Sequence, residues 1–393
     1  MAGASIVTAH GRRITLTIAG DPHDVHAVIA PVACLPNGAY HVRWRVVSED
    51  GHPVDGSYAF AIGTGVSLDT SMIAGSMAMS AHDSAMSSHG EGMMHHESAN
   101  WGANVLGAPV ALAVLRGLAL GALLSLSGLL FFRWGASVDD ARRAMVLARW
   151  LAILSPLLLI VHFALWVMNT HAQHMLNAES LDVATGTGMG HRELLRIGFA
   201  ILALWALSLA RQPKLALAAS VGALLVSSAI GHTAAIVPAW AIPGKAVHLL
   251  AGAAWMGGVI WLLVLDRADA TRFAREAARV SRVAMLCVIA VAISGLLETF
   301  LFLSAPSDIV RTPYGLLVLA KIVGTLILIG FGAHHRTRTM PKGGDEHWSP
   351  ELLATTLRGE MAVMIVVVLI GGLLSYVPVP QSVPPGIPTI TEP

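Results

Sequence analysis

The sequence predicts a mainly α-helical membrane protein, an eight-helix transmembrane bundle preceded by a small, partial antiparallel β-sandwich domain. Composition is the first reason, since 55% of the residues are hydrophobic and only 12% are charged, about half the charge of typical soluble domains. Eight apolar stretches follow residue 105, and each is about long enough to cross a bilayer as a helix. Before them, short runs alternate apolar and polar residues as strands do.

The predicted β domain spans residues 1–64. Its alternating runs are Arg12–Ala19, Ala39–Ser48 and Gly56–Ile62. In the second run, one face would carry Tyr40, Val42, Trp44 and Val46. Turn residues separate the runs at 36–38 and 50–53. Because so few strands bury little core, the domain is short for an independent sandwich.

Residues 65–104 form a predicted flexible linker that is rich in methionine and histidine. The stretch 71–97 lacks aromatic residues and holds six of the sixteen methionines and four histidines: Met72, Met77, Met79, His82, Met86, His89, Met93, Met94, His95 and His96. Thioether and imidazole groups suit copper. Their irregular spacing favours several weak, exchangeable sites over one fixed site, and a tether would keep the local copper concentration high.

The predicted transmembrane domain spans 105–377 and is followed by a proline-rich tail, 378–393. Its apolar stretches lie near 105–132, 145–168, 193–210, 214–231, 245–265, 282–304, 314–333 and 359–377. Most arginines and lysines follow the first, third, fifth and seventh stretches, which the positive-inside rule places in the cytoplasm. We therefore expect a multi-pass protein of the inner (plasma) membrane with both termini outside the cytoplasm.

The N-terminal residues do not explain how a β domain would be exported. Residues 1–20 contain no apolar core of a signal peptide. We expect either that the true start lies upstream or that the first helix carries the domain across the membrane.

Polar side chains within apolar helices are costly and indicate function. The predicted topology brings four of them from different helices to the outer third of the bundle, with two methionines at similar depth: His162, His232, His248, Glu298, Met168 and Met256. Imidazole with thioether suits copper, three histidines alone would also suit zinc, and a histidine pair could hold haem. Alternatively, these histidines bind no ligand and bond only to neighbouring helices.

Other polar residues are weaker candidates. Lys321 and Arg116 would neutralise Glu298 or extend toward the membrane surface. The loop predicted outside the cytoplasm after the second helix is also rich in histidine and methionine, and these residues are expected in a solvated loop: His171, His174, Met175, Met189 and His191. His334 and His335 close the seventh helix and are expected to be interfacial rather than an exit site. Asp50 and His52, one glycine apart, could converge on one Cu(II) ion.

Residues 42–60, VRWRVVSEDGHPVDGSYAF, resemble the closing strands of the CopC family of periplasmic copper-binding β-sandwiches. The family holds Cu(II) with an N-terminal histidine and the Asp and His of a D-G-H motif, which correspond to Asp50 and His52. The N-terminal histidine has no counterpart here, because the chain opens Met-Ala-Gly-Ala. The resemblance therefore implies a truncated CopC-like domain whose Cu(II) site lacks one ligand.

The membrane region resembles the CopD copper-resistance and uptake family. The segments that carry this resemblance are GHTAA at 231–235, HLLAGAAWMGG at 248–258, the stretch 281–299 and PYGLLVLAK at 313–321. The resemblance implies a CopC–CopD fusion that handles copper and moves it inward from the periplasm. No ATP-binding motif occurs in the sequence, so transport would be passive or ion-coupled.

The expected function is therefore non-enzymatic copper transport, resistance or homeostasis. Copper as Cu(I) or Cu(II) is the expected ligand, and the partners are copper ions, the bilayer and periplasmic copper-binding proteins. A net charge of +1 does not indicate nucleic-acid binding. The alternatives are a haem-binding electron-transfer protein and a copper-binding membrane module that does not transport.

Overall fold

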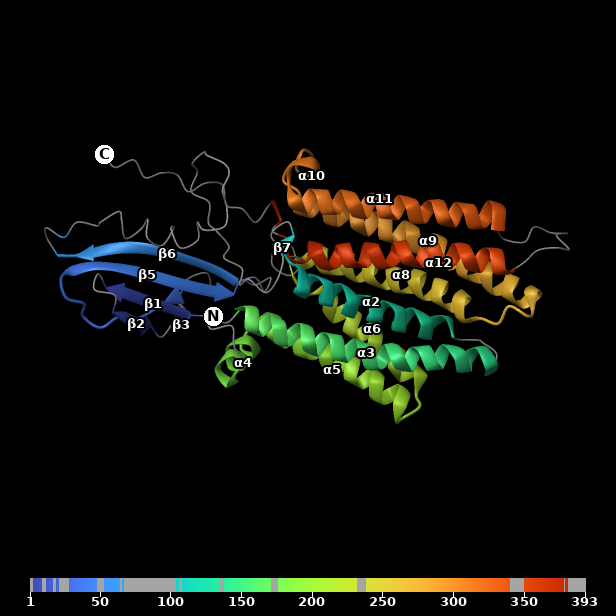
Figure 1. Cartoon of the computed structure of the whole chain (residues 1–393), viewed down its shortest axis with the longest axis horizontal. Coiled ribbons are helices and arrows are strands. Elements are labelled where there is room, and N and C mark those ends of the chain that lie inside the picture. Colours follow the sequence, from blue (N-terminus) through green and yellow to red (C-terminus); the bar gives the residue numbers. More distant parts are fainter. Residues whose placement is uncertain are drawn as a thin grey trace. The chain divides into compact units, whose positions relative to one another are not determined.

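A computed structural model describes most of the chain (Figure 1). The described residues are 3–8, 12–16, 19–20, 28–47, 53–63, 66, 104–105, 108–133, 138–170, 176–231, 238–339, 350–377 and 379–380. The chain divides into two compact units, Met1–Ala99 with Val167–Thr187, and Asn100–Trp166 with Gly188–Pro393. We call the first the β unit and the second the helical unit.

The β unit contains an antiparallel four-stranded sheet in the order β2-β1-β5-β6. Its strands are β1 (Gly3–Thr8), β2 (Arg13–Leu16), β5 (Gly38–Val47) and β6 (Pro53–Ile62), and β3 (Ala19–Gly20) pairs separately with β4 (Val28–Ile29). The three predicted strand regions are confirmed. The central strand β1 was not predicted, because its sequence GASIVT shows too little alternation to register as a strand.

The core of this sheet is small. Ile6, Tyr40 and Val42 are buried, and the partly buried residues packed against them are Ile14, Leu16, Leu35, Trp44, Phe60 and Ile62. The Tyr40 ring stacks on Phe60 with centroids 5.3 Å apart, and its hydroxyl donates to the Pro36 carbonyl at 2.6 Å. The predicted inward face is thus confirmed for Tyr40, Val42 and Trp44, while the side chain of Val46 lies outside the described residues.

Each predicted apolar stretch coincides with a helix (Figure 1). The long helices are α2 (Val110–Phe132), α3 (Val138–Thr170), α5 (Gly188–Ser208), α6 (Pro213–Ser228), α8 (Pro238–Val264), α9 (Ala270–Phe302), α11 (Pro313–His334) and α12 (Pro350–Leu374). The short elements are β7 (Asn104–Val105), β8 (Ala108–Pro109), α4 (Ala178–Thr185), α10 (Asp308–Arg311) and the π-helix η2 (His335–Thr339).

Within the described ranges, six of these helices are long and apolar enough to cross a membrane: α2, α3, α8, α9, α11 and α12. This establishes a multi-pass membrane protein. The predicted number of eight crossings is not confirmed. The shorter helix α6 has 16 residues, and α5 carries Glu193 and Arg196 in its first half.

Several helices begin earlier than hydropathy indicates. Helix α8 begins at Pro238, so Lys245 lies within the helix rather than at its edge. Helix α9 begins at Ala270, after Asp269 caps it by accepting a hydrogen bond from the Arg272 amide. Met189 lies in α5 and is buried, and His191 lies in the same helix, so the prediction of a solvated loop is wrong for these two residues.

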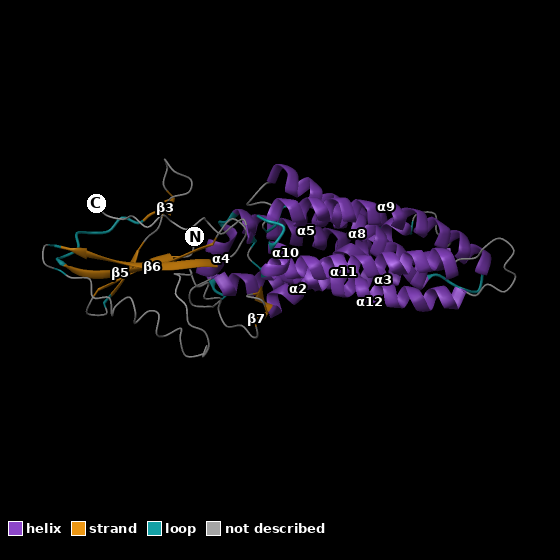
Figure 2. Cartoon of the chain, turned by 90° about the horizontal axis from the view of Figure 1, so that it is seen from above, coloured by secondary structure: helices purple, strands orange, loops and turns teal. Residues whose placement is uncertain are grey.

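Close contacts at glycine bring the helices together, and Figure 2 shows the elongated bundle from above. A Cβ added to Gly257 of α8 would lie 2.1 Å from the carbonyl carbon of Gly128 in α2. Similarly, a Cβ on Gly372 of α12 would lie 2.3 Å from the Ala113 carbonyl oxygen in α2. Small residues at such crossings let membrane helices approach closely, so α2 packs tightly against both α8 and α12.

Candidate functional site

The structure describes five of the predicted primary metal ligands: His162, Met168, His248, Met256 and Glu298. The remaining candidates lie outside the described residues: Asp50, His52, His232, Met77, Met79, His82, Met86, His89, Met93, Met94, His95, His96, His171 and His174. Among the described residues, no group of three or more His, Cys, Asp or Glu side chains is arranged to hold a metal ion. The four-residue layer with His232 therefore stays a prediction.

Two of the predicted ligands share one helix interface. The Nδ1 atom of His248 in α8 lies 3.0 Å from the Ser294 hydroxyl in α9, and the ring packs over Gly295. Ser294 is one helical turn before Glu298. The α8–α9 contact therefore places His248 against Ser294 and Gly295, one turn before Glu298, and the common layer of ligands stays a prediction.

The hydrogen bonds of Ser294 indicate which His248 nitrogen is available. The Ser294 hydroxyl donates its single proton to the Ala290 carbonyl at 2.6 Å. Its bond with His248 then requires Nδ1–H as the donor, which puts the lone pair of the neutral ring on Nε2. Metal-binding histidines are commonly oriented in this way, through a hydrogen bond from the second ring nitrogen.

Glu298 lies in a positively charged setting. Its Oε1 atom is buried and has no hydrogen-bond partner within the described part of the chain. Lys245 of α8 and Lys321 of α11 both act on its charge, as predicted for Lys321. Lys245 also donates to the Ile230 carbonyl at 2.7 Å. A carboxylate with one unused oxygen and two nearby ammonium groups can bind a cation, but weakly.

Met256 lies two turns further along α8 from His248 and is 4% exposed. The Ser125 hydroxyl of α2 donates to its sulfur at 3.3 Å. The thioether is thus held at the α2–α8 contact, on the same helix as the open imidazole nitrogen. It is the soft ligand nearest to His248 along α8.

His162 lies in a different environment, which we call the His162 network: His162, Tyr376, Arg116, Glu193 and Arg196. The imidazole is fully buried, and its Nε2 atom lies 2.6 Å from the Tyr376 hydroxyl. The Arg116 guanidinium stacks over the Tyr376 ring at 5.7 Å, and Arg196 pairs with Glu193. Only Nδ1 remains for a metal, beside two guanidinium groups, so the role of His162 as a ligand stays a prediction.

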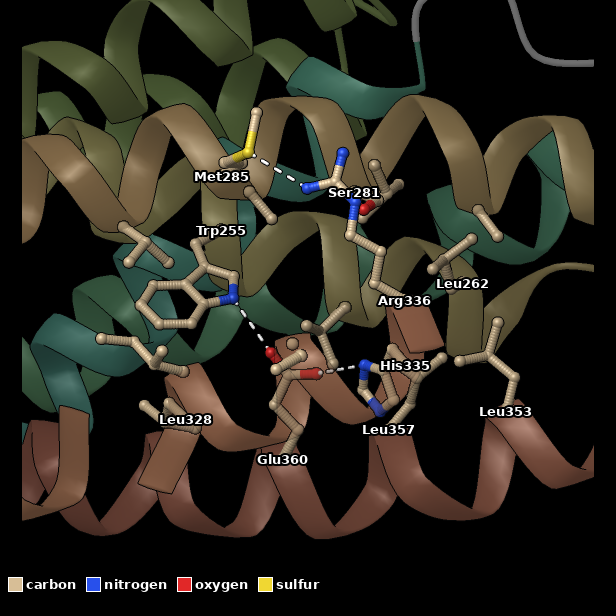
Figure 3. Close-up of a pocket in the computed structure, with 18 residues that line it drawn as sticks. Trp255, Leu262, Ser281, Met285, Leu328, His335, Arg336, Leu353, Leu357 and Glu360 are labelled. Atoms are coloured by element: carbon tan, nitrogen blue, oxygen red, sulfur yellow. Dashed lines mark hydrogen bonds and ion pairs between the residues drawn. The ribbon is translucent and has the colours of Figure 1, made fainter. Parts of the chain in front are cut away.

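A second polar site lies along the C-terminal half of α8, beside the end of α11 and the first half of α12 (Figure 3). A cavity of about 300 Å³ is lined mostly by apolar side chains and by Trp255, His335, Arg336 and Glu360. His335 Nδ1 lies 3.4 Å from Glu360 Oε2, and the Trp255 indole donates to Oε1 at 3.0 Å. We call these three residues the inner triad.

The inner triad revises one expectation and adds a residue that the sequence analysis missed. His334 is exposed, as expected of an interfacial residue, but His335 is only 6% exposed and faces Glu360. Glu360 was overlooked because it lies at the predicted start of the last apolar stretch. An acidic residue followed by the apolar run 361–370 was the available signal.

In the β unit, Val47 pairs with Pro53 across the β5–β6 hairpin, and Asp50 and His52 fall between them in sequence. Burial and the neighbouring Arg43 lower the pKa of His41 from 6.5. His41 is therefore neutral near pH 7 and chemically able to bind a metal.

Two segments of the chain match families of known proteins. Residues 1–63 match the family model for the CopC domain, and residues 274–374 match the model for copper resistance protein D. The chain joins a CopC segment to a CopD segment. Copper resistance protein C of Escherichia coli is 51% identical over 35 residues, which cover 9% of this chain and 28% of that protein. No solved structure matches the chain.

The two matched ranges contain different candidate residues. The CopC segment contains Asp50 and His52, and the CopD segment contains Glu298, Lys321, His335 and Glu360. His162 and His248 precede the matched CopD range. Since the chain spans about a quarter of the curated relative that it matches, that protein's activity does not transfer to it directly.

Proposed function

We propose that this CopC–CopD fusion is a copper-binding transport protein of the inner membrane, which takes up copper from the periplasm for copper homeostasis or resistance. The observation that carries the proposal is the match to copper-resistance families at both ends of the chain. The His248 and Glu298 arrangement in a multi-pass bundle supports it.

Copper is the cargo in this proposal. It would enter between α8 and α9, where His248 Nε2 and Glu298 Oε1 are both available as ligands. Met256 would accept Cu(I) next, because a thioether favours that ion over harder ones. Lys245 and Lys321 would keep the affinity low, and conduction requires a site that also releases its ion.

The CopC segment and the linker would collect copper outside the cytoplasm. Asp50 and His52 would contribute to a Cu(II) site, and the methionines and histidines of the linker 65–104 would pass the ion on through weak, exchangeable sites. Periplasmic copper-binding proteins would then be the donors. Both termini would face the periplasm, as the distribution of basic residues indicates.

Copper uptake by purified protein in liposomes tests the proposal. We expect His248→Ala and Glu298→Gln to reduce uptake strongly, because each removes one open ligand atom, and His232→Ala tests the third predicted ligand. His191→Ala and Glu276→Gln are matched controls, since His191 is exposed in α5 and Glu276 is bound to Trp261. Uptake that is unchanged in His248→Ala and Glu298→Gln would contradict the proposed entry site.

Spectroscopy separates the remaining alternatives. A Soret band in the purified protein would indicate a haem-binding electron-transfer protein. Copper found by metal analysis without flux into liposomes would indicate a binding module that does not transport. We expect bound copper, no Soret band and measurable flux.

A further inference from the structure

Helix α8 donates two tryptophan hydrogen bonds to buried or half-buried glutamates near its C-terminal end. Trp255 donates to Glu360 of α12, and Trp261 donates to Glu276 of α9, both at 3.0 Å. Each glutamate also has a basic partner at 3.4 Å, which is His335 for Glu360 and Arg279 for Glu276. The two sites have the same arrangement of groups, but the base is a histidine in one and an arginine in the other.

That difference decides which site can exchange a proton. The base beside Glu276 is an arginine, a residue type that does not give up its proton at physiological pH. A histidine releases its proton near neutral pH. The His335–Glu360 pair can therefore hold one proton on either partner or gain and lose a proton.

Burial makes this exchange sensitive to its surroundings. Glu360 is 3% exposed and His335 is 6% exposed, so both ions would have lost most of their hydration. For a buried pair, the cost of desolvation roughly offsets the attraction between the charges. Desolvation therefore offsets much of the attraction that would otherwise hold the proton on His335. Trp255 bonds the carboxyl group through Oε1 in both states, so protonation of Oε2 does not require Glu360 to move.

Water has a route to the pair. Both residues line the cavity of about 300 Å³, many times the volume of one water molecule, and exposed Arg336 lines it as well. The side chains of Arg336, Ser281, His335 and Glu360 give water molecules polar partners there (Figure 3). Arg336 itself donates to the Met285 sulfur at 3.1 Å rather than to Glu360.

The local backbone aims the histidine into this cavity. The π-helix η2 begins at His335, directly after the exposed His334. Wider π turns often occur at functional sites, and this one places His335 inside the bundle while Arg336 stays exposed. Among the described residues that line the cavity, Arg336 is the other charged side chain, and His334 directly precedes His335 in the chain.

We infer that the His335–Glu360 pair is a proton-binding site, which exchanges one proton with water in the cavity and couples that exchange to copper movement. The second half of this inference rests on the proposed function. The proton moves between water and either Glu360 Oε2 or His335 Nδ1, and no other bond is made or broken. Because the sequence has no ATP-binding motif, coupling of this kind would supply the driving force for copper transport.

Infrared difference spectroscopy on the full chain tests the site without any transport. A step from about pH 8 to about pH 5 should produce a carboxyl signal from protonated Glu360. Glu360→Gln should abolish this signal while keeping the Trp255 bond, because a glutamine oxygen still accepts it. Glu276→Gln is the matched control and should leave the signal unchanged. His335→Gln should shift the pH at which the signal appears. A signal that survives in Glu360→Gln, or no signal in the native protein, would overturn the inference.

Liposomes loaded with a pH-sensitive dye test the coupling. Copper uptake by the native protein should change the internal pH, and this change should be lost in Glu360→Gln and kept in Glu276→Gln. An equal pH change in Glu360→Gln would overturn the coupling. If the native protein moved no copper, the proposed function would fail, and the infrared result alone would decide the proton site.

Discussion

Within the described part of the chain, the Tyr376 hydroxyl is the hydrogen-bond partner of His162. The imidazole is fully buried in α3, and the Tyr376 hydroxyl at 2.6 Å is the contact that satisfies Nε2. Buried polar groups are costly when they lose such a partner, and the cost exceeds what the bond contributes when it is formed. Tyr376 follows the last residues of α12, so this bond also ties the end of that helix to α3.

We predict that Tyr376→Phe lowers the free energy of unfolding by about 1–3 kcal/mol, because it leaves His162 Nε2 without its partner. The Phe ring keeps the stacking surface for Arg116, while the loss of the hydroxyl also removes its hydrogen bond with Arg116. Thermal unfolding of the purified protein in detergent measures the effect. Tyr58→Phe, at a ring that is 57% exposed, should leave the unfolding temperature unchanged. Equal stability of both variants would contradict this account of His162.

Functional candidates could be identified from the sequence only where a polar side chain lay within an apolar helix, because its burial in a membrane is energetically costly. His162, His248 and Glu298 were found in this way, and each makes a polar or electrostatic contact in the structure. Their partners Tyr376 and Ser294 were not predicted, because hydroxyl groups near or within apolar helices carry no comparable signal. Which histidine nitrogen is engaged depends on tertiary contacts that no spacing encodes.

At the scale of elements, the helical unit depends on glycine contacts along α2. Gly128 and Gly257 meet where α2 crosses α8, and each would place a Cβ inside the backbone of the other helix. Because no side chain can move aside there, a larger residue must push the helices apart. Met256 and its bond to Ser125 lie beside this crossing, so helix separation would also disturb the predicted copper route.

We predict that Gly257→Ala destabilises the helical unit by at least the 1–3 kcal/mol typical of overpacking, roughly as judged from soluble cores. Size-exclusion chromatography after heating measures the loss of folded protein. Gly252→Ala on the same helix is the control, since nothing lies within 4 Å of its added Cβ. A Gly257→Ala protein as heat-resistant as Gly252→Ala would show that α2 and α8 are not in such close contact.

The length of each apolar stretch predicted that a helix would form there, but it did not predict the residue at which the helix begins. The first turns of α9, ATRFAREAARVS, carry charge on one face, so a hydropathy window excludes them although they are helical. The short helix α4 was missed for a related reason, since its signal is the Asn177 capping box rather than hydrophobicity. In the sheet, β1 is recognisable only through its pairing with β2 and β5.

At the scale of the whole molecule, the basic residues gather at one end of the helical unit. Arg133 follows α2, and Arg142 and Arg143 lie in the first turns of α3; Arg267 lies between α8 and α9, and Arg272 lies in the first turn of α9. The Ala268 amide and Arg143 hold the pKa of Asp266 below its usual range, so this carboxylate is ionised and paired with Arg143 at neutral pH. Acidic residues count little in the positive-inside rule, so the arginines predict a cytoplasmic location for this end.

The chain has a native cysteine whose labelling can test this orientation. Cys34 is exposed in the β unit, and Cys287 is buried in α9. If the β unit lies outside the cytoplasm, a membrane-impermeant maleimide should label Cys34 in intact spheroplasts. The variant Cys34→Ala should lose the label, whereas Cys287→Ala should keep it, because the buried thiol does not react at the surface.

Labelling that appears only after lysis would place the β unit in the cytoplasm. It would reverse the entry and exit ends of the proposed copper route, since His248 and Glu298 would then face inward and the inner triad outward. Labelling before lysis would instead place the CopC segment and the open His248 nitrogen on the side from which copper arrives. The result therefore tests the orientation of the chain in the membrane, which the family matches leave open, with one native thiol and no change to the rest of the chain.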